Sequence, residues 1–420
     1  MLYRFLLVAI VIQSCISHAV CAQEMRSPIS LRDAIENTLR LQPQLRSFPL
    51  KRESAAGDRE TAGLRPPLMA NAGAEDAIGT GSLSDLNSAE LTISLSRVIE
   101  LGNKRTARVA VADSRITILD TEQEIVELDL LAEVTYRFID VVAAQERVDI
   151  QRQAREMAEE TVMFLEPLVQ AGRAPEFELG RARARLSNAG AIERQSQSYL
   201  EASRVMLSTM WLSQSPDFSQ ANADLFEVGE AGSLNALLIS LFENPSIQMY
   251  ASQSRLMEAR LQVARAAESA NVQWTAGIRH LKEIDDTGLI FNVSIPLGAK
   301  ERASGGIRAA QANLAELEYS REAALNAMRG QLVSLHIQLT QLLDQIGVLQ
   351  GEVLPELSEV IEQTRSFYEA GNYSYVELIS AQREYLDAQH LLVTSAANAH
   401  RVRTEIERLS GQPLALQSED

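Results

Sequence analysis

A glycine-led stretch occurs once in each half of this chain and constrains its fold more than any other feature. The first copy reads AGRAPEFELGRARARL and the second AGNYSYVELISAQREYL, and they align without a gap. The matched pairs are Gly172 with Gly371, Glu178 with Glu377, Leu179 with Leu378, and Ala182 with Ala381. Because glycine adopts positive φ without steric cost, each copy can end one helix and reverse the chain into the next. The chain is therefore predicted to be two copies of one unit, each with a helical hairpin.

Composition favours extended helices and argues against nucleic acid as a partner. Only 5% of the residues are aromatic, and Ala, Leu, Glu, Gln and Arg dominate the long segments, which suits long helices better than a compact enzyme core. Acidic residues outnumber basic ones 56 to 39. Binding to nucleic acid needs clustered Lys and Arg to neutralise phosphates, so this charge balance disfavours it.

The first residues are predicted to be a secretory signal peptide over 1–22. Arg4 precedes an apolar run over 5–12, and small residues come before Gln23. An alternative is a lipoprotein cleavage box that would leave Cys15 acylated, but Gln13 fits such a box poorly. Cleavage after Ala22 is favoured, and it removes both cysteines. The mature chain then has no disulfide and no thiolate metal site.

Each half of the mature chain shows the order helix, strand hairpin, long helix, tip and returning helix. Prolines interrupt the first helix of each half, at Pro43 and Pro245. Alternating apolar and polar residues predict strands at about 68–76, 89–98, 273–282 and 288–297, with a short acidic turn over 283–287. A helix is then predicted from about Lys104 to Val169, on the order of 100 Å long.

Apolar residues in the later helices repeat at alternating spacings of three and four, which predicts coiled-coil packing between neighbouring helices. Pro355 is an expected kink. The heptad positions are Leu332, Leu335, Leu339, Leu342, Ile346, Leu349 and Val353, and then Leu378, Ala381, Tyr385, Ala388, Leu392, Ser395, Ala399, Val402, Ile406 and Leu409.

The predicted strands have two interpretations. One is a soluble sheet with one face in a core and the other in water. The other is a set of membrane strands, since each has about ten residues, the length that a tilted strand needs to cross a bilayer. A lone four-stranded sheet would leave open edges, which closure into an oligomeric barrel removes. Membrane strands are favoured, with Trp274 a candidate for the interfacial aromatic belt.

These observations divide the chain as follows: signal peptide 1–22, first structural repeat 23–212, linker 213–232, second structural repeat 233–411, and a frayed C-terminus 412–420. The linker lacks strong periodicity and carries Pro216, Gly229 and Gly232. The tips of the two repeats lie near 172 and 371.

The repeated order, behind a signal peptide, resembles the TolC-type outer-membrane factor (outer membrane efflux protein) family from Ser30 to Gly411. The proline breaks, the turns at Gly102 and Gly298, and the two tips carry the resemblance. The turn over 100–105, Glu-Leu-Gly-Asn-Lys-Arg, is similar to an ELG-x-KR turn of the branch that serves heavy-metal cation efflux.

The resemblance implies a mostly α fold with a membrane β-barrel portion. A homotrimer would build a long α-barrel in the periplasm and a shared β-barrel, four strands per subunit, in outer-membrane lipid. The implied partners are a periplasmic adaptor (membrane fusion protein) and an inner-membrane pump of the RND type. The chain would be the passive exit duct of this tripartite system for heavy-metal cations. Drugs, other organic solutes or type I protein secretion are alternative cargoes.

The resemblance also suggests candidate site residues near the tips. Glu377 falls where the family places the first of two carboxylates that narrow the closed end, while Ser380 stands at the second position. A symmetric ring of Glu377 would attract cations, although a solvated surface Glu is an equal interpretation. The candidates for adaptor contact are Gly172, Arg173, Gly371, Asn372 and Tyr373.

No catalytic, cofactor or metal site is predicted. The mature histidines are His280, His336, His390 and His400, and none shares a helix face with another at metal-ligand spacing. The sequence has no nucleophile elbow, phosphate loop or dinucleotide fingerprint in a suitable context. The alternative from another functional class is a soluble periplasmic coiled-coil scaffold.

Overall fold

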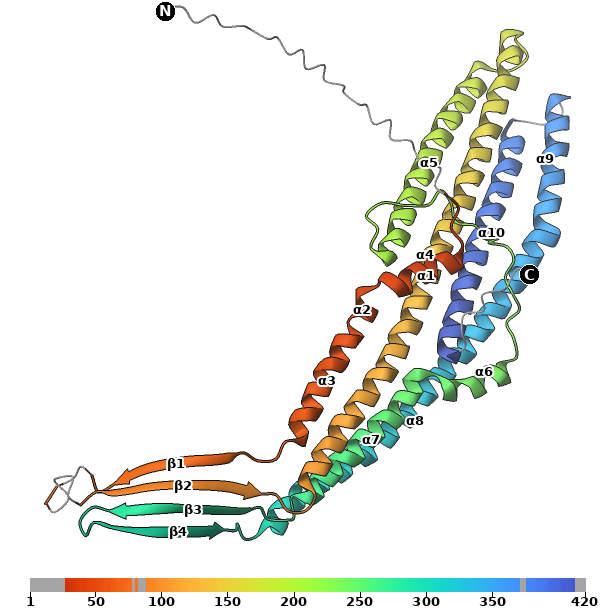
Figure 1. Cartoon of the computed structure of the whole chain (residues 1–420). Helices are drawn as coiled ribbons and strands as arrows, with labels where there is room; N and C mark the ends of the chain where they lie inside the picture. Colours follow the sequence, from red (N-terminus) through yellow and green to blue (C-terminus); the bar gives the residue numbers. More distant parts are fainter. Residues whose placement is uncertain (1–26, 78–79, 82–87, 371–374, 412–420) are drawn as a thin grey trace, which may run out of the picture.

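The computed structural model describes residues 27–77, 80–81, 88–370 and 375–411. The molecule is elongated, with a four-stranded sheet at one end and two helical hairpins at the other (Figure 1). The predicted signal peptide with Cys15, the tip residues Gly371, Asn372 and Tyr373, and the C-terminal segment 412–420 lie outside the described residues. No helix in the described ranges combines the length and the apolar character needed to cross a bilayer.

The first half of the chain follows the predicted order. Its elements are α1 (Leu31–Leu41), α2 (Pro43–Arg46), α3 (Phe48–Gly63), β1 (Leu68–Glu75), β2 (Glu90–Ile99), α4 (Lys104–Gln170), α5 (Glu176–Ser208) and the short helix η3 (Thr209–Trp211). A capping box begins α1: the Asp33 backbone N–H donates to Ser30 Oγ at 3.2 Å, and the Ser30 N–H donates to the Asp33 carboxylate at 3.1 Å. Pro43 ends α1 and begins α2 because it has no N–H to continue the ladder.

The second half repeats that order. Its elements are α6 (Leu234–Ser240), η4 (Leu241–Glu243), α7 (Pro245–Ala266), β3 (Val272–Leu281), β4 (Asp286–Ser294), α8 (Ala299–Val348), η5 (Leu349–Val353), α9 (Leu354–Glu369) and α10 (Tyr375–Ser410). The segment η5 is a π-helix directly before Pro355. Proline cannot bond to the preceding turn, so the helix widens where the kink was expected.

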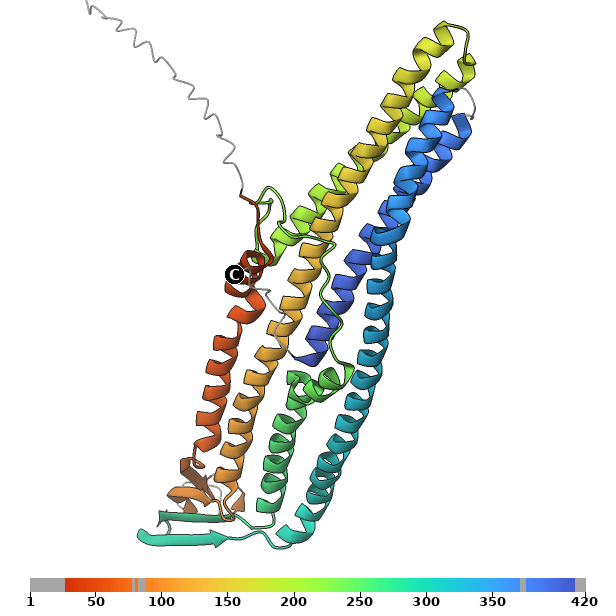
Figure 2. The same ribbon diagram turned by 90° about the vertical axis from the view of Figure 1, so that its right-hand side faces the viewer.

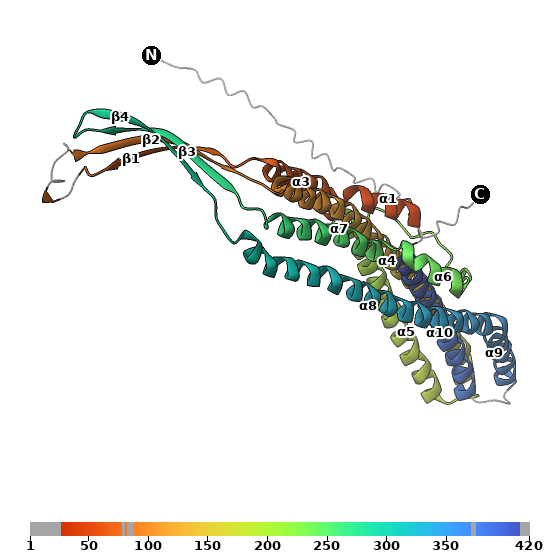
Figure 3. The same cartoon turned by 90° about the horizontal axis from the view of Figure 1, so that it is seen from below.

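The sheet is antiparallel with the order β1-β2-β3-β4. Each strand is directly followed or preceded in the chain by one long helix. The four helices α3, α4, α7 and α8 therefore lie side by side in the same order as the strands to which they are connected (Figures 2 and 3). One chain is thus a curved strip, and β1 with α3 forms one border while β4 with α8 forms the other. The mostly helical fold with two helix-hairpin-helix units is confirmed.

The main core lies at mid-length, where α10 packs between α4 and α8. Leu332 and Leu339 of α8 are fully buried, as the heptad spacing predicts. Small residues of α10, including Ala396 and Ala399, let the helices approach closely. The repeat boundaries at 212 and 233 stay a prediction.

The segment predicted as a linker is packed into this core. Phe218, Ala221 and Leu225 are buried, and Ala221 forms a β-bridge with Ile29. The amide of Gln145 on α4 exchanges two hydrogen bonds with the Ala221 backbone, at 2.8 and 3.0 Å. The segment lacks periodicity because these individual contacts, rather than a regular helix or strand, fix its position.

Two predicted boundaries in the second hairpin are wrong. β4 ends at Ser294, so Ile295 and Leu297 lie beyond it, although they continue the alternation. Pro296 has no N–H for the ladder, and Gly298 adopts a φ of 72° that begins the turn into α8. The turn comprises residues 282–285, so Asp286 and Thr287 belong to β4. Asp285 supplies the positive φ that closes this turn.

Candidate functional site

The first candidate site is the sheet, which has one apolar face across all four strands. Directly paired residues share a face, and Ile93 pairs with both Ala72 and Ile278, which in turn pairs with Leu289. Ile93, Leu289 and Phe291 are 63%, 88% and 73% exposed. The apolar residues of this face are Leu68, Ala70, Ala72, Ala74, Leu91, Ile93, Leu95, Trp274, Ala276, Ile278, Leu289, Phe291 and Val293. Polar residues on the same face lie towards its ends: Arg97 near the helices, and His280 with Thr287 near the second hairpin turn.

The opposite face is polar and internally bonded. Arg279 of β3 forms an ion pair with Glu90 at 2.7 Å and donates to Thr92 Oγ1 at 3.2 Å. Asn71 of β1 donates to Ser96 Oγ at 3.1 Å, and Ser96 is buried. In a soluble sheet the apolar face is the buried one, whereas here the apolar face is exposed.

An apolar face of this extent is unfavourable in water. Each Å² of apolar surface costs roughly 25 cal/mol when it is exposed, and contiguous apolar patches mark interaction or membrane sites. No helix of the described chain covers this face, because α3, α4, α7 and α8 continue from the strand ends. The sheet therefore needs an apolar medium or another molecule against it.

Both borders of the strip are open. Within the described residues, β1 pairs only with β2, and β4 pairs only with β3. Unpaired strand edges invite pairing with another chain.

Tight turns join the sheet to the long helices. Gly102 precedes α4 with a φ of 77°, and Gly298 precedes α8 with a φ of 72°. Lys104 secures the first turn by donating to the Ser269 carbonyl at 2.6 Å, across to the chain that leads into β3.

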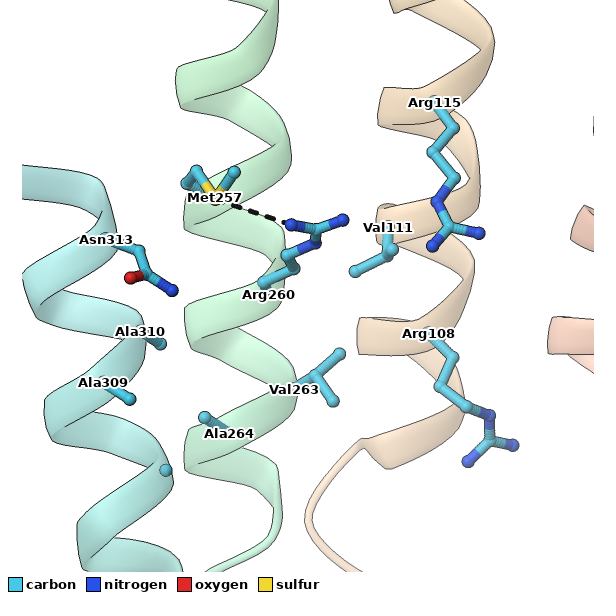
Figure 4. A pocket seen from close by; sticks show the side chains of 11 residues that line it. Arg108, Val111, Arg115, Met257, Arg260, Val263, Ala264, Ala309, Ala310 and Asn313 are labelled. Carbon is cyan, nitrogen blue, oxygen red and sulfur yellow. Dashed lines mark hydrogen bonds between the residues drawn. The ribbon is translucent and has the colours of Figure 1, made fainter. Parts of the chain in front are cut away.

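A shallow groove of about 520 Å³ lies beside these turns, between α4, α7 and α8 (Figure 4). Its lining includes Arg108, Arg115 and Arg260 together with the apolar residues Val111 and Val263. The two guanidinium nitrogens of Arg108 are bound by the Glu100 carboxylate at 2.5 and 3.0 Å. The residues that line this groove include no carboxylate, cysteine or histidine, so it offers no ligand set for a metal ion.

The second candidate site is the tip region at the far end. Gly172, with a φ of 70°, lies between α4 and α5, and the N–H of the exposed Arg173 donates to the Leu168 carbonyl at 2.8 Å. The aligned pairs Leu179 with Leu378 and Ala182 with Ala381 are all buried. The tip repeat is therefore a repeat of packing as well as of sequence.

Contacts between the two hairpins hold the tips together. Arg365 of α9 forms an ion pair with Glu160 of α4 at 3.2 Å, and the rings of Tyr368 and Phe164 lie 5.4 Å apart. Glu178 of α5 lies near the Tyr368 hydroxyl. Burial, together with the charge of Glu178, raises the pKa of Tyr368 to about 12.

Two comparisons with known proteins agree with each other. The outer membrane efflux protein family matches residues 34–211. The cobalt-zinc-cadmium resistance protein CzcC of Cupriavidus metallidurans is 24% identical over 323 residues, which cover 76% of this chain and 77% of CzcC. Over residues 34–211 the chain is therefore similar to the outer membrane efflux protein family.

A further relative and a solved structure extend this similarity. The nickel-cobalt-cadmium resistance protein NccC of Alcaligenes xylosoxydans xylosoxydans is 23% identical over 233 residues, which cover 56% of this chain and 53% of NccC. A crystal structure of CusC has the same fold, with a TM-score of 0.76 and 16% identity over 91% of this chain and 92% of CusC. The predicted resemblance to this family and to its heavy-metal branch is thus confirmed.

The predicted site residues that the structure describes lie at both ends of the molecule. Trp274 is half-buried near the start of β3, at the end of the sheet next to the helices. Glu377 is exposed on the first turn of α10, and Ser380 Oγ donates to Glu384 at 3.1 Å. Gly172 and Arg173 lie between α4 and α5, whose joined ends are at the opposite end of the molecule from the sheet (Figure 1).

Each of the four histidines in the described residues forms a hydrogen bond with another part of the chain. His400 bonds the Leu225 carbonyl at 3.0 Å, His390 bonds the Gln151 amide at 2.7 Å, and His336 bonds the Gly232 carbonyl at 3.1 Å. His280 bonds Thr287 across the second hairpin at 3.2 Å. Within the described ranges, no three His, Cys, Asp or Glu side chains lie close enough to hold a metal ion.

Sequence reasoning missed the residues that join the two hairpins. Tyr368, Arg365 and Glu160 interrupt no pattern, because each is an ordinary polar or aromatic residue on a long helix. The only available signal was the alignment of Glu178 with Glu377, which marked the carboxylate near Tyr368 but not Tyr368 itself.

Proposed function

We propose that this chain is the outer-membrane exit duct of a tripartite efflux system. The observation that carries the proposal is the sheet, with an uncovered apolar face, a bonded polar face and two open edges. Lipid would contact the apolar face, and the polar face would line an aqueous lumen, as in barrels of the outer membrane.

Closure of the barrel requires further copies of the chain. Three copies would pair β4 of one with β1 of the next and give about twelve strands, an even number as outer-membrane barrels require. The same step would bring α8 of one copy beside α3 of the next and continue the helical layer into a tunnel. A homotrimer is therefore the proposed functional unit.

The proposed duct continues through the periplasm to the tips. The helix α4 alone has 67 residues, which corresponds to about 100 Å. A periplasmic adaptor would contact Gly172 and Arg173 at the first tip and Gly371, Asn372 and Tyr373 at the second. An inner-membrane pump of the RND type would supply the substrate, so the duct itself carries out no chemical reaction.

Heavy-metal cations are the proposed cargo. The support is the name of the relative CzcC, a cobalt-zinc-cadmium resistance protein, together with the acidic chain. In the trimer, a ring of the exposed Glu377 would attract cations at the narrow end. Trp274 would lie at the periplasmic interface of the bilayer, where aromatic belts occur.

Single-channel conductance in planar bilayers tests this function. The purified mature protein should give discrete, cation-preferring openings, and Glu377→Ala should reduce the cation preference. The matched control is Glu384→Ala, two turns further along α10, which should leave the preference unchanged. Monomeric protein in the soluble periplasmic fraction, without conductance, would instead support the scaffold alternative.

A further inference from the structure

A second groove, of about 340 Å³, lies towards the tips between α4, α9 and α10. The floor is α10, with Leu378, Gln382 and Tyr385, while α4 and α9 form the two walls. The ion pair between Arg365 and Glu160 spans the walls at 3.2 Å. A groove of this volume between packed helices suits a single inserted side chain rather than another helix.

Gln382 is the unusual residue of this groove. Its side chain is only 7% exposed, and its Oε1 atom accepts no hydrogen bond within the described part of the chain. A buried acceptor without a partner costs free energy comparable to a lost hydrogen bond, and most native ones are satisfied. The terminal amide torsion of Gln is broad, so a small rotation presents Oε1 to a donor in the groove.

The charges around the groove select the type of donor. Three carboxylates line it, those of Glu156, Glu160 and Glu362, against the one guanidinium of Arg365. Glu160 is already paired with Arg365, and Glu156 lies 3.8 Å from Arg155. Among the described residues, no cation lies within ion-pair distance of Glu362. A cationic donor is therefore electrostatically favoured.

The remaining lining fits an aliphatic stem. Met157, Phe164 and Ile361 give the walls apolar surface. Long basic side chains bury their methylenes along such surfaces while the charged head stays at a polar site. A bare metal ion is a poor match, because no cluster of three ligating side chains exists among the described residues.

We propose that this groove binds an arginine or lysine side chain of a helical protein partner, with the cationic head donating to Gln382 Oε1 and pairing with Glu362. The identity of that partner as the periplasmic adaptor rests on the proposed function. The preference of the groove for an alkylguanidinium or alkylammonium head does not depend on the proposed function.

Saturation-transfer NMR on the detergent-solubilised full mature chain tests the groove directly. The probes are butylguanidinium, butylammonium and the neutral analogue butylurea. We expect both cations to bind and butylurea to bind at least about tenfold more weakly, because hydrogen bonds to charged donors are the stronger ones. Gln382→Leu and Glu362→Gln should each weaken the binding of butylguanidinium about tenfold.

Gln389→Leu is the matched control, because Gln389 has a buried Oε1 without a partner among the described residues but does not line the groove. It should leave the binding of butylguanidinium unchanged. If Gln382→Leu fails to fold, as judged by its melting temperature, Glu362→Gln carries the test alone. Equal binding of butylurea, unchanged binding in Glu362→Gln, or displacement of butylguanidinium by stoichiometric Zn²⁺ would overturn the proposal.

Conductance of the same preparation separates the two hypotheses. Normal channels without selective binding of cations would refute the groove and leave the duct intact. Selective binding without channels would refute the duct and leave the groove.

Discussion

Tyr368 shows how one side chain can join two hairpins. Its hydroxyl lies near Glu178 of α5, while its ring contacts Phe164 of α4. We expect Tyr368→Phe to keep the ring contact and to lower the free energy of unfolding by about 1 kcal/mol, because the polar contact with Glu178 is lost. Hydrogen exchange should become faster around residues 165–180. Tyr319→Phe, at an exposed position, should leave that exchange unchanged.

His400 makes the stability of the core depend on pH. Burial lowers the pKa of its imidazole, against the hydrogen bond to the Leu225 carbonyl, which raises that pKa. The unfolded chain then takes up a proton near pH 6.5 while the folded chain resists it, so stability falls as the pH drops below about 6.5. His400→Gln should flatten this fall in melting temperature between about pH 7 and pH 5.5.

The control for this pH dependence is His336→Gln. His336 also bonds a backbone carbonyl, that of Gly232, but on an exposed surface of α8. An equal flattening in both variants would show that burial of His400 is not the cause.

At the scale of elements, the two turns from sheet to helix look alike but differ in the space around them. A Cβ on Gly102 would lie 2.4 Å from Ser269 Oγ, whereas a Cβ on Gly298 would meet no atom closer than 3.6 Å. We expect Gly298→Ala to lower the free energy of unfolding by only about 1–2 kcal/mol, the cost of placing an alanine in the left-handed backbone conformation. Gly102→Ala should cost more, because Ser269 must also shift. Melting temperatures and membrane yield would measure both, and equal losses would contradict this account.

The elements were predictable where their periodicity or their end signals are local. The capping box at Ser30, the break at Pro43 and the heptads of α8 all depend on residues within one or two turns. The end of β4 was missed because Ile295 and Leu297 keep the alternation that Pro296 interrupts only in the hydrogen bonds. The packing of 213–232 was also missed, since its partners Gln145 and His400 are distant in sequence.

At the scale of the whole molecule, the order of the strands determines that of the helices. The sequence could predict one strip of this kind, because each strand is directly connected to its helix. It could not identify the contacts between hairpins, such as Arg365 with Glu160, which form only once the long helices lie side by side. The same limit applies to Gln382, which is buried by residues of α4 and α9.

Two adjacent residues of β4 test which face of the sheet meets lipid. Phe291 and Asn292 are both exposed and lie on opposite faces, since they pair with Ala276 and Thr275. If the apolar face contacts lipid, Phe291→Lys should destabilise the membrane-inserted protein by about 2–4 kcal/mol. Asn292→Lys should insert normally and shift the ion preference towards anions.

Outer-membrane fractionation and the yield of heat-modifiable oligomer measure insertion for both variants, and reversal potentials measure the ion preference of Asn292→Lys. Because the two positions are neighbours on one strand, strand propensity and turn geometry cannot account for a difference between them. Normal insertion of Phe291→Lys would mean that the apolar face is covered by protein, and the sheet would then be an interface between copies rather than a wall in the bilayer.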